Sequence, residues 1–123
     1  MTVVPVVFLL GMGVAIGAYM GYRYLRGERN SQTLAGVHLL LGAGGLELLV
    51  MLLRGAPSGE TLPRNAMGST VALIVAGALA TGLFVPIIAK SRPGIIGGSL
   101  AVHAAIGTIG FALLLFWAWG AIG

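Results

Sequence analysis

Residues 33–53 read TLAGVHLLLGAGGLELLVMLL, an apolar run interrupted by only two ionisable side chains, His38 and Glu47. An α-helix rises about 1.5 Å per residue, so about 20 apolar residues cross the roughly 30 Å of hydrocarbon in a bilayer. This stretch therefore predicts a transmembrane helix. Its two ionisable residues are the first candidates for function, because such residues are rare inside a membrane span.

Three further apolar stretches have the same length and character. We expect the four spans at roughly Val3–Tyr22, Thr33–Leu53, Ser69–Ala89 and, after a turn at Ser91–Gly94, up to about Trp119. The connection Arg54–Gly68 is rich in glycine and proline, which break helices. The sequence therefore predicts an all-α membrane protein, a single domain over residues 1–123 in which four transmembrane helices form a bundle.

The overall composition agrees with this class of protein. Hydrophobic residues make up 58% of the chain and charged residues 8%, whereas soluble domains carry about 25% charged residues. Because there is no cysteine, disulfides, iron–sulfur clusters and cysteine nucleophiles are excluded. The spans offer few convergent polar groups, so we do not expect an independent enzyme. Met1–Leu10 lacks the basic region of a secretory signal, and we read it as part of the first permanent span.

The basic residues lie mostly in two short loops, the first and the third. These five residues are Arg23, Arg26, Arg29, Lys90 and Arg92, against Arg54 and Arg64 in the middle loop. Positive charge beside a span sets topology, so we expect no nucleic-acid partner despite the net charge of +4. The first and third loops are predicted to be cytoplasmic and both termini non-cytoplasmic, in a bacterial inner or photosynthetic membrane.

The chain is also expected to use one two-helix hairpin twice. An offset of 65 residues aligns Val37-His38 with Val102-His103 and continues through the glycines that follow each histidine. The same offset pairs Gly17 with Gly82. We therefore expect an internal repeat of about residues 1–58 and 66–123. Two such units are parallel repeats related by an axis along the membrane normal, which puts both histidines at one depth.

The histidines and the glycines that follow them form the predicted site. On an α-helix the positions i, i+4 and i+7 share one face, so each histidine lies in line with two glycines that leave a flat, apolar surface. Haem iron takes axial imidazoles, and its macrocycle needs such a surface. We therefore expect one haem b, with His38 and His103 as axial ligands of the iron. The predicted haem-facing glycines are Gly42, Gly45, Gly107 and Gly110.

These residues resemble the small four-helix b-type cytochromes, broadly the cytochrome b561-like domains and the haem-carrying membrane anchors of redox complexes. The resemblance implies an electron-transfer or accessory subunit of a respiratory or photosynthetic complex, with other subunits as partners. Cytochrome b561-like domains usually carry two haems, whereas the two histidines of this chain serve one. Arg29, Lys90 and Arg92 lie one or two helical turns away and are candidates to pair with the haem propionates.

Other interpretations remain open on the sequence alone. In one alternative each histidine makes an interhelical hydrogen bond in a cofactor-free structural subunit. A chlorophyll-type pigment would use each imidazole singly, and copper with two nitrogen ligands would need a further ligand. Glu47 lies nine residues after His38, about 180° around the helix, so it is not expected in the same pocket. A proton-carrying role or a contact with a partner subunit are its alternatives.

Overall fold

A computed structural model describes the backbone of residues 3–55 and 66–122, with side chains through Gly120. The elements are α1 Val4–Leu25, α2 Gln32–Arg54, α3 Ala66–Ser91, the short 3₁₀ helix η1 Pro93–Ile95, and α4 Ile96–Ile122. Each α-helix is long and apolar enough to cross a membrane. The prediction of an all-α four-helix membrane bundle is confirmed, with helices that extend a few residues beyond most of the expected span limits.

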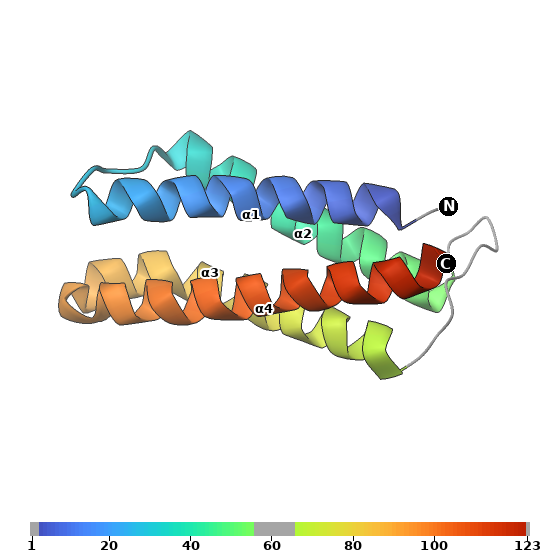
Figure 1. Cartoon of the computed structure of the whole chain (residues 1–123). Coiled ribbons are helices and arrows are strands. Elements are labelled where there is room, and N and C mark those ends of the chain that lie inside the picture. The colour runs from blue at the N-terminus through green and yellow to red at the C-terminus, as the bar shows by residue number, and fades with distance from the viewer. Residues whose placement is uncertain (1–2, 56–65, 123) are drawn as a thin grey trace.

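The helices are arranged as two antiparallel hairpins, α1 with α2 and α3 with α4, which lie side by side (Figure 1). We call the end with the two short hairpin connections, residues 26–31 and 92–95, the basic end. The opposite end, where α1 begins and α4 finishes, is the terminal end. Most of the predicted loop Arg54–Gly68 lies outside the described residues. Contacts within each hairpin are more extensive than contacts between the hairpins.

Local chemistry explains where the helices start and stop at the basic end. The chain leaves α1 through Gly27, whose φ of 73° is a left-handed conformation that favours glycine. The Ser31 side chain then accepts a hydrogen bond from the Leu34 amide at 3.1 Å and caps the start of α2. In the second hairpin Pro93 follows α3 and opens η1, since proline is well suited to a first helical turn. Both connections are therefore short, and each holds its two helices antiparallel.

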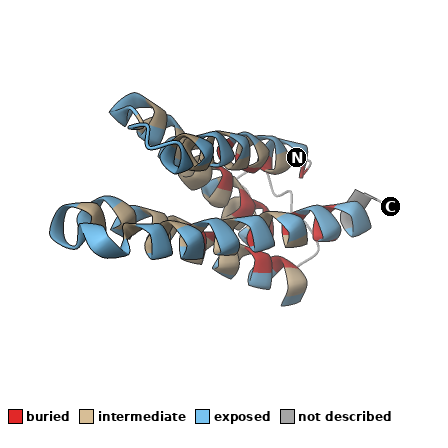
Figure 2. Cartoon of the chain, turned by 60° about the vertical axis from the view of Figure 1, so that its left-hand side comes forward, coloured by how far each residue is buried: buried red, intermediate tan, exposed pale blue. Residues whose placement is uncertain are grey.

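The hydrophobic core lies in the terminal half of the bundle. The buried apolar residues are Val3, Val6, Leu10, Leu49, Leu52, Leu53, Val71, Val75, Ala78, Leu114, Trp117 and Ala118. They come from the beginnings of α1 and α3 and the final turns of α2 and α4, and they gather toward the end where the termini lie (Figure 2). By contrast, no residue in 14–44 or 79–109 is buried. The chain's own side chains therefore close one half of the bundle and leave the other half accessible.

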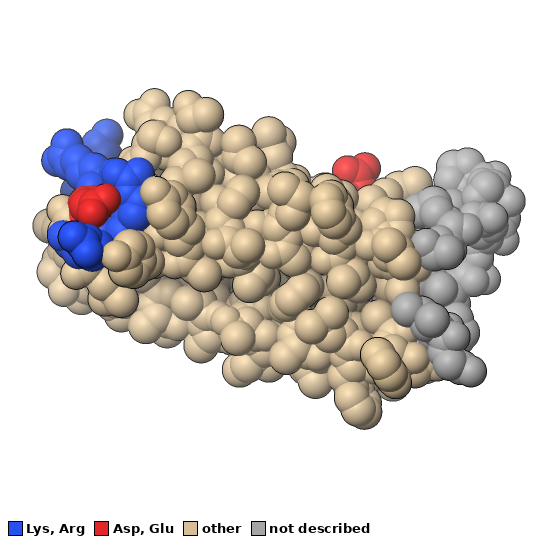
Figure 3. All heavy atoms as spheres, turned by 45° about the horizontal axis from the view of Figure 1, so that its top comes forward, with Lys and Arg blue, Asp and Glu red and all other residues tan. Residues whose placement is uncertain are grey.

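The charged residues mark the accessible half. Figure 3 shows Lys and Arg side chains gathered at one end of the face in view, whose described surface is otherwise largely uncharged. Within this group Glu28 forms exposed ion pairs with Arg23 at 3.1 Å and Arg26 at 3.2 Å. Exposed pairs contribute roughly 0–1 kcal/mol each, so this cluster adds little to stability. Its main consequence is a strong difference in charge between the ends of the bundle.

Candidate functional site

The two histidines meet at the boundary between the hairpins. His38 comes from α2 and His103 from α4, and their ring centroids are 5.9 Å apart with an interplanar angle of 88°. Both residues are half-buried. The structure thus brings together two imidazoles that are separated by 65 positions in the sequence and belong to different hairpins.

Each imidazole is anchored on the backbone of the other helix in its own hairpin. His38 Nδ1 lies 2.8 Å from the Gly13 carbonyl oxygen, and His103 Nδ1 lies 2.9 Å from the Ala78 carbonyl oxygen. A carbonyl oxygen only accepts, so Nδ1 carries the hydrogen and donates it, and Nε2 of a neutral ring keeps its lone pair. Among the described residues neither Nε2 has a hydrogen-bond partner. Both rings therefore present a nitrogen that is able to bind a metal.

A glycine on the neighbouring helix makes room for each ring. A Cβ atom at Gly17 would lie 2.8 Å from His38 Cε1, and one at Gly82 would lie 2.8 Å from His103 Cε1. Carbon atoms in proteins do not approach so closely, so a side chain at either position would displace the imidazole. The 65-residue offset pairs Gly17 with Gly82, but their contact with the imidazoles was not predicted. The offset was the signal that could have identified them.

The surroundings of His103 include a hydroxyl group that His38 lacks. Thr81 Oγ1 lies 3.3 Å from His103 Nδ1 and donates within α3 to carbonyl oxygens, at 2.9 Å for both Gly77 and Ala78. Under the 65-residue offset the counterpart of Thr81 is Ile16, which has no hydroxyl group. The two imidazoles therefore have equivalent backbone anchors but different side chains beside Nδ1. Sequence reasoning missed Thr81, because a threonine on an apolar helix carries no distinctive pattern.

The four glycines predicted to line a cofactor fall into two groups. At Gly42 no atom lies within 4 Å of an added Cβ, and at Gly107 only the Ala78 Cβ does, at 3.9 Å. At Gly45 the position is filled by Leu10 at 2.6 Å, and at Gly110 by Ile74 at 3.0 Å. The first group leaves open surface one helical turn from each histidine. The surroundings of Gly45 and Gly110 instead favour close packing of helices within a hairpin.

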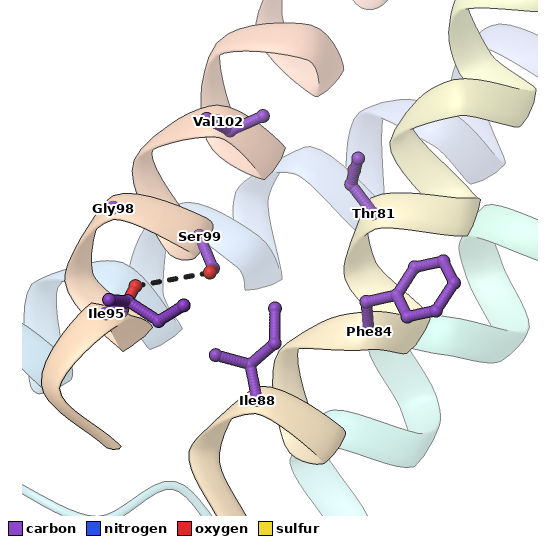
Figure 4. Close-up of a pocket in the computed structure, with 7 residues that line it drawn as sticks. All are labelled: Thr81, Phe84, Ile88, Ile95, Gly98, Ser99 and Val102. Carbon is purple, nitrogen blue, oxygen red and sulfur yellow. Dashed lines mark hydrogen bonds between the residues drawn. The ribbon is translucent and has the colours of Figure 1, made fainter. Parts of the chain in front are cut away.

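An apolar cavity of about 520 Å³, open to the surface and lined largely by exposed residues, lies between α3 and α4 on the basic side of His103 (Figure 4). Its lining residues are Thr81, Phe84, Ile88, Ile95, Gly98, Ser99 and Val102. The Ser99 hydroxyl donates to the Ile95 carbonyl oxygen at 3.2 Å, and Thr81 connects the cavity to His103. This region of the accessible half is therefore apolar, with the hydroxyl groups bonded to backbone.

The donor set of the site consists of two imidazoles. No group of three or more His, Cys, Asp or Glu side chains gathers within residues 3–55 and 66–122. A bare metal ion would be under-coordinated by two nitrogen ligands. Haem iron needs only two from the protein, since the macrocycle supplies the other four. Arg29, Lys90 and Arg92 are exposed at the basic end.

Glu47 lies away from this site. It is exposed on α2, whereas His38 on the same helix faces the other hairpin. Nine residues separate the two, which corresponds to about half a revolution of the helix beyond two full turns. The carboxyl group is therefore not part of the histidine site, as the helical phase predicts.

Comparison of the chain with models of known protein families, with curated proteins and with solved structures finds no match in any of the three.

Proposed function

We propose that the chain binds one haem b between its two hairpins, with His38 and His103 as the axial ligands of the iron. The observation that carries this proposal is the distance of 5.9 Å between the two ring centroids. Metal–imidazole bonds of about 2 Å on each side put the centroids of two axial imidazoles roughly 6 Å apart. The separation of the two rings is therefore close to the one expected for two imidazoles on a single metal centre.

The hydrogen bonds of the two rings support the same role. Histidines that bind a metal almost always donate their other N–H to a carbonyl or carboxylate, which fixes the tautomer and the orientation of the ring. His38 and His103 both do this, through Nδ1, to backbone carbonyl oxygens of the neighbouring helix. Because these acceptors belong to rigid helices, the two Nε2 atoms are held in place before a metal arrives.

The loose packing of the accessible half is consistent with a bulky apolar ligand. None of the residues in 14–44 and 79–109 is buried, so the bundle is loosely packed around the histidines and toward the basic end. Gly42 and Gly107 keep open surface next to the imidazoles, and we propose these two as the haem-facing glycines. The basic side chains Arg29, Lys90 and Arg92 are exposed at the basic end and are candidates to pair with haem propionates.

The haem iron, when bound, would supply a one-electron couple. His38 and His103 would hold the group between the hairpins, their orientation fixed by the Nδ1 hydrogen bonds to Gly13 and Ala78, and the apolar side chains around them would limit the access of water. Because one histidine pair serves one haem, electrons would need a partner to cross the whole membrane. We therefore propose an electron-transfer or accessory subunit of a redox complex, with the basic end cytoplasmic and both termini on the opposite side.

The test is the reduced-minus-oxidised absorption spectrum of the detergent-purified protein, before and after addition of hemin. We expect a b-type α band that disappears in His38→Ala and in His103→Ala, because each variant removes one axial ligand. Leu40→Ala is the matched control, since this exposed leucine lies on the same helix as His38 but faces outward. It should keep the band at wild-type intensity.

Three results would overturn the proposal. A wild-type protein that stays colourless after addition of hemin would favour a structural subunit, in which the histidines serve as interhelical hydrogen-bond donors. A chlorin band would assign the site to a chlorophyll-type pigment. Loss of the band in only one of the two histidine variants would exclude ligation of one iron by both.

A further inference from the structure

Glu47 is an acidic residue on the outer surface of a membrane-spanning helix. It is exposed, and it lies seven residues before Arg54, which places it about 10 Å along the axis from the terminal end of α2. Figure 3 shows one acidic group among the basic side chains and another that stands alone on the apolar surface. Glu28 and Glu47 are the two acidic residues that the structure describes, and Glu28 is the one paired with arginines.

The chain provides no partner for this carboxyl group among the described residues. No ion pair or hydrogen bond involves the Glu47 side chain there. A carboxyl group that faces hydrocarbon is costly unless another polar group meets it, and such residues normally face a protein neighbour rather than lipid. The position of Glu47 therefore points to a neighbour outside the monomer.

The surface around Glu47 is suited to a close helix–helix contact. Gly36, Leu40, Ala43 and Glu47 follow one another at spacings of three or four residues and form the face of α2 opposite His38. Leu40 is 72% exposed. At Gly36 no atom lies within 4 Å of an added Cβ. Small residues at such positions allow two transmembrane helices to approach closely.

A second copy of the chain is the partner that fits this face. Two copies inserted in the same direction carry Glu47 at the same depth, and a twofold axis along the membrane normal brings the two carboxyl groups together. Two carboxyl groups in contact can share one proton, because like charges at that distance are unfavourable, so that the protonated group donates and the other accepts. A carboxyl group is thus complementary to itself. A different subunit would have to supply a basic or donor group at that depth.

We propose that the chain forms a parallel homodimer through the α2 face Gly36, Leu40, Ala43 and Glu47, with the two Glu47 carboxyl groups hydrogen-bonded across the twofold axis. This interface lies on the side of α2 away from His38, so it leaves the histidine site unobstructed. The dimer does not depend on the haem proposal.

Disulfide cross-linking in native membranes tests the interface directly, because the natural chain contains no cysteine. Oxidation of Leu40→Cys should give a covalent homodimer as the main product. Leu83→Cys on α3 is the matched control, since both leucines are exposed and each lies eight residues from the basic end of its helix. The control should remain at least tenfold less cross-linked. Equal cross-linking of the two variants, or a Leu40→Cys product that contains a different protein, would overturn the proposal.

The carboxyl group itself is tested by sedimentation equilibrium in detergent. A hydrogen bond between transmembrane helices contributes roughly 1–2 kcal/mol, so Glu47→Leu should weaken the dimer about tenfold. Glu47→Gln should keep most of the affinity, because an amide also offers a donor and an acceptor. A Glu47→Leu variant that dimerises like the wild type would show that the carboxyl group is not at the interface. Circular dichroism checks that each variant remains folded.

Discussion

The two hairpins hold their histidines by the same contacts but differ in the residues around them. In the first, His38 donates to Gly13 and rests against Gly17, and in the second, His103 donates to Ala78 and rests against Gly82. Many paired positions differ under the 65-residue offset, and three of the differences change the chemical character of the hairpin. They pair Ile16 with Thr81, Gly21 with Pro86 and Glu47 with Ala112.

The contacts that orient the imidazoles are shared by the two hairpins, whereas other residues distinguish one hairpin from the other. A backbone carbonyl and a glycine suffice to orient the ring in both. The second hairpin adds a hydroxyl group and a proline, and Pro86 lacks the N–H that would bond the Gly82 carbonyl oxygen within α3. The first hairpin adds a carboxyl group on its outer face. The shared contacts therefore belong to the common site, and the differences give each hairpin its own properties.

The largest effect is expected from a side chain at either glycine that supports a ring. Gly17→Val and Gly82→Val would each push an imidazole away from its carbonyl acceptor, because even the Cβ would lie 2.8 Å from Cε1. We expect loss of the haem band in both variants and a loss of stability of about 1–3 kcal/mol. Absorption spectra and thermal unfolding in detergent measure the two effects.

Gly21→Val is the control for these variants, since no atom lies within 4 Å of an added Cβ at Gly21 on the same helix as Gly17. It should keep the haem band. If Gly82→Val lost the band while Gly17→Val kept it, the two hairpins would not support their histidines in equivalent ways.

A smaller effect on stability is expected to distinguish Gly45 and Gly110, which pack against another helix, from Gly42, which has open space around it. Gly45→Ala places a methyl group 2.6 Å from Leu10, and Gly110→Ala places one 3.0 Å from Ile74, so overpacking should cost about 1–2 kcal/mol, more at Gly45 than at Gly110. Gly42→Ala meets no atom within 4 Å and should leave the apoprotein unchanged or stabilise it by about 0.5–1 kcal/mol. Thermal unfolding of the three apoprotein variants distinguishes these outcomes. If Gly42→Ala destabilised the apoprotein as much as Gly45→Ala, the distinction between packed and open glycines would be wrong.

Exchange of the residues beside Nδ1 should shift the haem potential slightly. Thr81→Val removes an oxygen atom 3.3 Å from His103 Nδ1, which makes the imidazole a weaker donor to iron and favours the reduced state. We expect the midpoint potential to rise by on the order of 20 mV, the equivalent of about 0.5 kcal/mol for one electron. Ile16→Thr should lower it by a similar amount, and Ile16→Val should not change it. A redox titration that gives the same shift for all three variants would refute this role of Thr81.

The smallest effect is expected at the connection of the first hairpin. Glu28 pairs with Arg23 and Arg26, but the carboxylate side chain is 46% exposed and water screens the interaction. Glu28→Gln should therefore change the free energy of unfolding by less than about 1 kcal/mol. Unfolding at low and high salt checks the electrostatic origin. A change above 2 kcal/mol would mean that this connection contributes more to the hairpin than its geometry indicates.

Much of the architecture could be predicted from the sequence because the bilayer imposes a simple length and hydropathy rule. The apolar runs predicted four helices, and the scarcity of histidine identified His38 and His103 as the pair to examine. Their proximity followed from the offset that places them at one depth. The sequence also showed that Glu47 lies on another face of its helix than His38.

The contacts around the histidines could not be predicted in the same way. Gly45 and Gly110 share a helix face with the histidines, but whether a face meets a cofactor or a leucine depends on the neighbouring helix, which helical periodicity does not specify. The roles of Gly17, Gly82 and Thr81 likewise depend on the rotation of α1 and α3 against their partners. Such contacts are properties of pairs of helices, whereas sequence patterns report one helix at a time.

The backbone anchors of the two imidazoles have a consequence for how the site tolerates mutation. A carbonyl oxygen is encoded by no particular amino acid, so the acceptor for Nδ1 does not require one specific side chain at that position. Positions 13 and 78 illustrate this, because one carries glycine and the other alanine while the hydrogen bonds measure 2.8 and 2.9 Å. Exchange of glycine for alanine at either position is therefore expected to leave the orientation of its ring intact, whereas a larger side chain would meet the neighbouring helix, because a Cβ at Gly13 already lies 3.6 Å from the Leu41 Cβ.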